Sequence, residues 1–173
     1  MNIKTKIMEY FFDNPTARLR LRNIERELSL PFPSVVRYCK ELKEENILTV
    51  VEISGVKFYT STRQEEFLLH KKLYNIRRLH ETGLIDYLKK KLSNPPIILF
   101  GSYSKGEDLE NSDIDIYIET PSTKKIPLDM FAKQLKREIQ IIQHKSIKDI
   151  SNPRLANNIV NGITINSFVE VFK

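Results

Sequence analysis

Cysteine is nearly absent from this chain of 173 residues, and Cys39 is its single copy. An internal disulfide is therefore excluded, and so is a metal site built from several cysteines. No apolar run approaches the roughly 20 residues that a membrane-spanning helix needs, and the N-terminal MNIKTKIMEY lacks the unbroken apolar stretch of a secretory signal. The three histidines show no spacing typical of metal binding. We therefore expect a cytoplasmic protein without a membrane partner.

Hydrophobic residues make up 40% of the chain, which is enough for a buried core. The length suits one ordinary domain or two small ones. The net charge is +6, and the basic surplus lies before residue 97, because residues 97–173 carry ten basic and ten acidic side chains. A surplus of this size is compatible with a polyanionic partner and equally with a basic, soluble protein that has none.

The first third of the chain has a helical pattern followed by a β-rich one. Apolar residues at helical spacing predict three helices, at residues 2–13, 22–28 and 33–45. Cys39 lies on the apolar face of the third helix, so we expect it to be a core residue rather than a reactive thiol. Two β-rich runs then predict a hairpin, with strands at residues 47–53 and 56–60 on either side of Ser54-Gly55.

This order of elements, together with the segment LPFPSVVRYCKELKEENILTVVEISGVKFYT, resembles the winged helix-turn-helix family. The resemblance implies that the third helix enters a DNA major groove. The residues that would contact DNA are Ser34, Arg37 and Lys40 on that helix and Lys57 on the wing. Three glutamates alternate with the basic residues of the helix, and winged helices also serve in dimerisation or protein docking. Both interpretations therefore stay open.

Residues 64–92 form one long helical pattern with an apolar stripe, and Gly83 lies where this helix would bend. Such a stripe packs against a neighbouring domain or against a second copy of the chain, so a homodimer is one expectation. The run Ser93-Asn94-Pro95-Pro96 breaks the helix. We therefore divide the chain into three regions, a winged helix-turn-helix at residues 1–62, a linker helix at 63–93 and a last domain at 94–173.

The stretch IILFGSYSKGEDLENSDIDIYI, residues 97–118, carries the chemistry of the last domain. Asp113 and Asp115 are one residue apart on a predicted strand, so they point the same way with Cα atoms roughly 6–7 Å apart. Carboxylates so placed can share Mg²⁺, which prefers carboxylate and phosphate oxygens. Gly101-Ser102, just before a predicted helix, offers backbone N–H groups to a phosphate. The pattern indicates a nucleoside triphosphate site, although each piece taken alone is also typical of an ordinary exposed strand or turn.

The same stretch resembles the polymerase beta-type nucleotidyltransferase superfamily, and more closely the minimal nucleotidyltransferases. The matching pattern is an apolar strand, Gly-Ser, three residues, Gly, five residues, Ser-Asp-x-Asp and a second apolar strand. The resemblance implies an α/β (α+β) fold with a small mixed-sheet palm, and transfer of a nucleoside monophosphate from a nucleoside triphosphate. Asp113 and Asp115 would hold two Mg²⁺ ions. Gly101, Ser102 and Ser112 would lie at the nucleotide, where Lys105 could add charge.

Active members of this superfamily carry a third carboxylate between two apolar residues of a later strand. Here that strand is expected at residues 138–143, after a helix at 128–137. Gln140 occupies the matching position, and Glu138 lies on the same strand face as the one acid that could substitute as a catalytic residue. A glutamine side chain can neither accept the proton of a hydroxyl acceptor nor offer a metal an anionic charge. This departure puts catalysis in doubt and leaves the fold expectation intact.

Two functions follow from these resemblances. The first is a metal-dependent nucleotidyltransferase that uses ATP or another nucleoside triphosphate. Its acceptor hydroxyl would lie on a protein, an RNA end or a small molecule, and minimal nucleotidyltransferases are frequently antitoxins that modify a partner protein. The second is a DNA-binding transcription regulator whose nucleotidyltransferase domain has lost catalysis.

Overall fold

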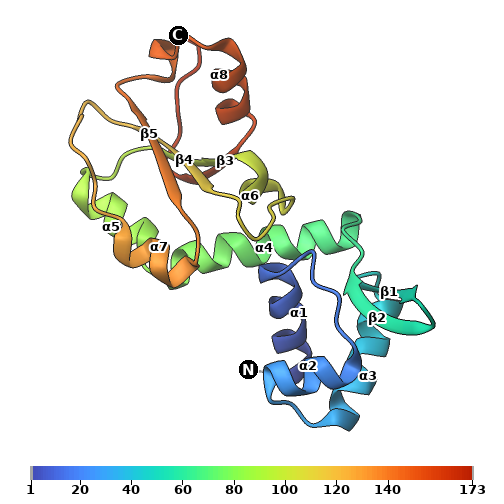
Figure 1. Ribbon diagram of the computed structural model, residues 1–173. Coiled ribbons are helices and arrows are strands. Elements are labelled where there is room, and N and C mark those ends of the chain that lie inside the picture. The colour runs from blue at the N-terminus through green and yellow to red at the C-terminus, as the bar shows by residue number, and fades with distance from the viewer. Residues whose placement is uncertain (1, 173) are drawn as a thin grey trace. The chain divides into compact units, whose positions relative to one another are not determined.

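The computed structural model describes residues 2–172 and is shown in Figure 1. Its packing divides the chain between Tyr74 and Asn75 into two compact units, which we describe separately as unit 1 and unit 2. The expected mixed α/β class is confirmed, with eight α-helices and two β-sheets in the described residues. The division between the units falls inside helix α4 (Glu65–Glu81). The boundaries expected after residues 62 and 93 remain predictions. No helix within residues 2–172 is both long and apolar enough to cross a membrane.

Unit 1 has the predicted order of elements. Its three helices are α1 (Ile3–Asp13), α2 (Leu21–Leu28) and α3 (Phe32–Glu44), and its antiparallel hairpin consists of β1 (Leu48–Ile53) and β2 (Val56–Ser61). Ser54 and Gly55 both have positive φ, 49° and 76°. Two such residues in a row match the twist of the flanking strands, and this explains the Gly at the turn.

The core of unit 1 is formed by α1, α2 and α3 together with β1 and the first part of α4. Ile7, Phe11, Ile24 and Leu42 are fully buried there, as is Cys39. Burial raises the pKa of the Cys39 thiol to about 12, so the thiol stays protonated at neutral pH. The expectation of a core cysteine is confirmed.

The single helix expected over residues 64–92 is wrong, because two helices occupy this stretch. Helix α4 ends at Glu81 and α5 (Leu84–Lys91) begins three residues later. Gly83 separates them with a φ of 75°. A Cβ at this position would meet no atom within 4 Å, so the backbone conformation, rather than space, favours glycine. The sequence pattern placed the bend correctly and missed that the helix stops there.

Unit 2 is built on a four-stranded mixed sheet with the strand order β5-β4-β3-β6. The strands are β3 (Ile97–Phe100), β4 (Ile114–Glu119), β5 (Ile139–His144) and β6 (Ile163–Asn166). Strand β3 is antiparallel to β4 and β6, whereas β4 and β5 run parallel. Besides α5 and the end of α4, unit 2 contains the helices α6 (Gly101–Lys105), α7 (Asp129–Leu135) and α8 (Pro153–Val160) and a short 3₁₀ helix, η1 (Ile147–Asp149).

Both faces of this sheet are covered, as Figure 1 shows for α8 on one side and α5 with α7 on the other. On the α5 and α7 face, Leu99 and Ile116 pack against buried leucines such as Leu88. On the other face, Tyr117 packs with Ile159 of α8. Since side chains alternate along a strand, Asp113 and Asp115 have the direction of Tyr117.

Candidate functional site

The carboxylate of Asp115 lies directly against the start of α6. Asp115 is paired with Phe100, the last residue of β3, and Gly101 follows Phe100 with a φ of 73°. A Cβ added to Gly101 would come within 2.2 Å of the Asp115 Oδ2 atom. Only glycine can therefore occupy this position without displacing the carboxylate. The sequence motif Gly-Ser and the second aspartate of the Asp-x-Asp motif are in this way brought together.

Asp113 adds a second carboxylate on the same side of β4. It immediately precedes the strand, whose second residue is Asp115. The pKa of Asp115 is raised above its ordinary value, first by burial and second by the negative charge of Asp113. Both effects disfavour the charged form of Asp115, and a bound cation would relieve both. The chemistry of these two oxygen donors suits Mg²⁺.

Gln140, rather than Glu138, lies against the aspartates. Strands β4 and β5 pair in register so that Gln140 is opposite Asp115, and the Gln140 Nε2 group donates a hydrogen bond to Asp113 Oδ2. Glu138 is exposed and precedes β5 by one residue, so the expected strand bounds of 138–143 shift to 139–144. Within residues 2–172, no group of three or more His, Cys, Asp or Glu side chains could hold a metal ion. Glu138 therefore does not complete a three-carboxylate site in this structure.

The residues expected at the nucleotide lie around α6 and the loop that follows it. Ser102 is partly exposed in the first turn of α6, and Lys105 is exposed at its end. Ser112 has a structural contact, because its Oγ atom accepts a hydrogen bond of 2.9 Å from the Leu109 backbone N–H. That bond closes the turn that leads into Asp113. The roles predicted for these residues remain predictions.

A buried ion pair near this turn was not predicted from the sequence. Arg137 Nη2 lies 3.1 Å from Asp108 Oδ2, and the Asp108 side chain is fully buried. Asn75 donates a hydrogen bond of 2.8 Å to Asp108 Oδ1. Asp108 stands among the exposed polar residues of a loop, so no periodic pattern distinguishes it from its neighbours. Its partners Asn75, from α4, and Arg137, from the segment before β5, come close to Asp108 only in the folded protein.

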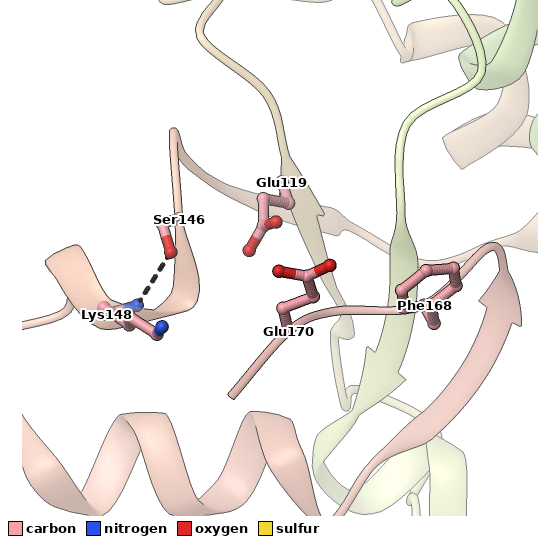
Figure 2. A pocket seen from close by; sticks show the side chains of 5 residues that line it. All are labelled: Glu119, Ser146, Lys148, Phe168 and Glu170. Carbon is pink, nitrogen blue, oxygen red and sulfur yellow. Dashed lines mark hydrogen bonds between the residues drawn. The ribbon is translucent and has the colours of Figure 1, made fainter. Parts of the chain in front are cut away.

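The cavity in Figure 2 lies at the other end of β4 and does not include the aspartates. It has a volume of about 540 Å³ and is lined by Glu119, Ser146, Lys148, Phe168 and Glu170. Glu119 is the last residue of β4, whereas Asp113 precedes the first. The Glu119 Oε2 atom accepts a hydrogen bond of 2.8 Å from the Ile147 backbone N–H. The cavity is thus separate from the candidate site.

The DNA-binding candidates lie on α3 and β2 of unit 1. Arg37 and Lys40 are exposed on α3, Ser34 is half-buried near its start, and Lys57 is exposed on β2. Arg37 pairs with Glu41 at 3.8 Å, and Lys40 pairs with Glu44 at 3.9 Å. Exposed pairs of this kind contribute only about 0.3–0.5 kcal/mol, so a phosphate could replace the glutamate.

Comparison with known proteins finds a similarity for most of unit 2. Residues 82–162 match the family model described as "Nucleotidyltransferase domain", and the matched segment contains Gly101, both aspartates and Gln140. This segment is therefore similar to nucleotidyltransferase domains, and the small mixed sheet of unit 2 is consistent with that similarity. No curated protein and no solved structure matches the chain significantly. The match does not extend to residues 1–81, so the winged helix-turn-helix stays a prediction.

The raised pKa of Asp115 predicts that Asp115→Asn stabilises the metal-free protein. The folded state binds the Asp115 proton more tightly than the unfolded state does, so the free energy of unfolding falls as pH rises from about 3.9, the ordinary pKa, to the raised pKa. At pH 7 the charged form is therefore unfavourable, and removing it should raise the Tm by a few degrees. Thermal unfolding between about pH 4 and pH 7 measures this, with the exposed Glu107→Gln as control. A lower Tm for Asp115→Asn would contradict it.

Proposed function

We propose that this protein is a metal-dependent nucleotidyltransferase that transfers a nucleoside monophosphate from a nucleoside triphosphate to a hydroxyl acceptor. One observation carries the proposal: the Asp115 carboxylate lies against Gly101 at the start of α6, with Asp113 on the same side of the strand. Both aspartates and Gly101 lie inside the segment that matches the nucleotidyltransferase domain.

In this proposal, some residues of the site bind the metal and others bind the phosphates. Asp113 and Asp115 would hold Mg²⁺, which would neutralise charge on the phosphates and align the attacking and leaving oxygens. The Ser102 hydroxyl and the backbone N–H groups at the start of α6 would hold the terminal phosphates, and Lys105 could add charge there. The resemblance implies a second Mg²⁺ ion, for which Gln140 would supply no negative charge.

A protein hydroxyl is the acceptor that we favour, because minimal nucleotidyltransferases, which this chain resembles, frequently modify a partner protein. A cytoplasmic location would supply ATP and Mg²⁺. The test begins with the nucleotide, since it does not require knowledge of the acceptor. ATP labelled on its α-phosphate is offered to the native chain with Mg²⁺, with EDTA, and with candidate acceptors. We expect nucleotide binding that requires the metal, followed by transfer of labelled AMP. Absence of any metal-dependent nucleotide binding would overturn the proposal.

A second candidate function is a DNA-binding regulator with a catalytically degenerate nucleotidyltransferase domain. Two observations favour it. Gln140 already occupies the third position beside Asp113, and unit 1 has the element order of a winged helix-turn-helix, with Arg37 and Lys40 exposed on its third helix. The homodimer, expected from the apolar stripe of residues 64–92, stays a prediction.

If unit 1 binds DNA, Arg37→Ala should weaken that binding about tenfold and reduce the dependence of the binding constant on salt by about one counterion. Fluorescence anisotropy at several salt concentrations, with DNA from upstream of the protein's own gene, measures both effects. Arg154→Ala is the matched control, because Arg154 is equally a single exposed arginine but lies on α8 in unit 2. Equal affinity of the two variants, or no binding to any DNA at low salt, would remove this candidate.

A further inference from the structure

The ion pair between Asp108 and Arg137 belongs to a larger buried polar network. Asp108 and Asn75 are 1% and 2% exposed, and the Arg137 side chain is 7% exposed. Replacing a buried ion pair by apolar residues of similar volume is often neutral or stabilising. Stability alone therefore does not explain why Asp108, Arg137 and Asn75 are buried together. The segments that these three side chains connect give a better indication of their role.

Arg137 connects the start of β5 with the loop that leads to Asp113. Besides pairing with Asp108, its Nη1 group donates hydrogen bonds to the backbone carbonyls of Leu109 and Ser112, the latter at 3.4 Å. These carbonyls belong to the two ends of the turn that precedes Asp113. A planar guanidinium can serve a carboxylate and two carbonyls at once, which an ammonium group cannot do with the same geometry.

The position of Arg137 is itself fixed by its neighbours in the chain. Lys136, the residue after α7, has a φ of 55°, and the Arg137 backbone N–H donates to the Ala132 carbonyl at 3.1 Å. The next residue, Glu138, accepts a hydrogen bond of 2.9 Å from the Ile114 backbone N–H. Arg137 therefore lies where β4 and β5 begin to pair, two residues before the strand that carries Gln140.

Asn75 extends the network to α6. Its Nδ2 group donates to the Asp108 carboxylate and, at 2.9 Å, to the Tyr103 carbonyl. Tyr103 directly follows Ser102, the residue proposed to contact phosphate. The network thus links the phosphate side of the candidate site, at α6, with the metal side, at Asp113.

We propose that Arg137, Asp108 and Asn75 are positioning residues, which hold the Gly101-Ser102 step and Asp113 at the separation that a metal-bound nucleotide requires. This inference rests on the proposed function, since it concerns the same site. None of the three residues is assigned contact with the nucleotide. They act through the turn at Leu109–Ser112, through the start of β5 and through α6.

The test compares Arg137→Lys with Arg154→Lys. The first variant keeps a positive charge beside Asp108 and loses the groups that reach the two carbonyls, and the second makes the same change on the exposed surface of α8. Three quantities are measured: the Tm, hydrogen exchange of individual amides, and the affinity for Mn²⁺ with ATP. For Arg137→Lys we expect a Tm close to that of the native chain, faster exchange at residues 109–114 with unchanged exchange in β3 and β6, and an affinity about 10- to 100-fold weaker. Arg154→Lys should change none of these.

Unchanged exchange at residues 109–114 and unchanged affinity would overturn the inference. So would a uniform loss of protection throughout unit 2, because it would show a purely structural role. If Arg137→Lys does not fold, Asn75→Ala replaces it, since that variant keeps the ion pair and removes the hydrogen bonds to Tyr103 in α6 and to Asp108. The native protein offers a further check: rapid exchange of the Leu109 and Ser112 amides would show that the turn is not held.

The two proposals fail in different ways. If the native chain binds no Mn²⁺ with ATP, the proposed function fails, whereas the exchange measurements still decide whether Arg137 holds the turn before Asp113. If the native chain binds and Arg137→Lys binds equally well, only the inference about the network fails.

Discussion

Asp113→Asn and Asp115→Asn should each reduce transfer of AMP from ATP by at least about 10³-fold. Removing a single hydrogen-bond donor from a site of developing charge already costs roughly 10²–10³ in rate, and these variants remove an anionic oxygen ligand for Mg²⁺. An asparagine keeps the shape of the side chain and removes its charge, so the effect isolates the charge. Transfer of labelled AMP to an accepting protein, measured over a range of Mg²⁺ concentrations, gives the rate.

The stability of these variants makes the result interpretable. Burial and the charge of Asp113 raise the pKa of Asp115, so Asp115→Asn should be more stable than the native chain in the absence of metal. A loss of activity in a more stable protein cannot result from unfolding. The control is Asp86→Asn, an exposed aspartate in the first turn of α5, which should retain full activity. Transfer that persists undiminished in Asp115→Asn would exclude the aspartate pair as the metal site.

Glu138→Gln tests the catalytic candidate that does not lie against the two aspartates in the structure. Glu138 is exposed and precedes β5, and Gln140 holds the position beside Asp113. We therefore expect this variant to transfer AMP within about twofold of the native rate, far from the factor of 10²–10⁴ typical of a lost general base. A loss of that larger size would return Glu138 to the site and require a local shift of the start of β5.

The local part of the site could be predicted from the sequence because it depends on short-range geometry. Asp113 and Asp115 share a side of β4 because side chains alternate along any strand. Gly101 was recognisable because the Gly-Ser step ends an apolar run, and the structure supplies the physical reason: a Cβ would collide with the Asp115 carboxylate. The hairpin of unit 1 was predictable in the same way, from a Ser-Gly step between two β-rich runs.

The rest depends on which segments meet, and no spacing rule states that. The register of β5 is one case: residues 138–143 and 139–144 both satisfy the apolar pattern, and only the pairing of Ile114 with Ile139 selects the second. Asp108 is another, because its burial requires Asn75 from α4 and Arg137 from the segment after α7. The division of residues 64–92 into two helices is a third, since Gly83 is compatible with a bend as well as with a stop.

Gln140→Asp should raise AMP transfer by about 10²–10⁴-fold if the third carboxylate is the one missing catalytic group. Gln140 lies opposite Asp115 in the register of β4 and β5, and its amide contacts Asp113. A carboxylate at this position would therefore face both aspartates, provide a third anionic oxygen donor and accept the proton of the acceptor hydroxyl. Because three carboxylates repel one another, the variant should also have a lower Tm than the native chain without metal and a larger gain of Tm when Mg²⁺ is added.

Gln140→Glu and Gln134→Asp complete this experiment. The first keeps the length of the glutamine side chain, so the better of Asp and Glu shows how far the carboxylate must reach from β5. Gln134→Asp makes the same chemical change as Gln140→Asp on the exposed surface of α7, and it should alter neither the transfer activity nor the stabilisation by Mg²⁺. Stronger stabilisation by Mg²⁺ without any gain in transfer would mean that the metal site can be completed while the chemistry cannot. Transfer would then be limited elsewhere in the domain, and the DNA-binding regulator would become the better account of the chain.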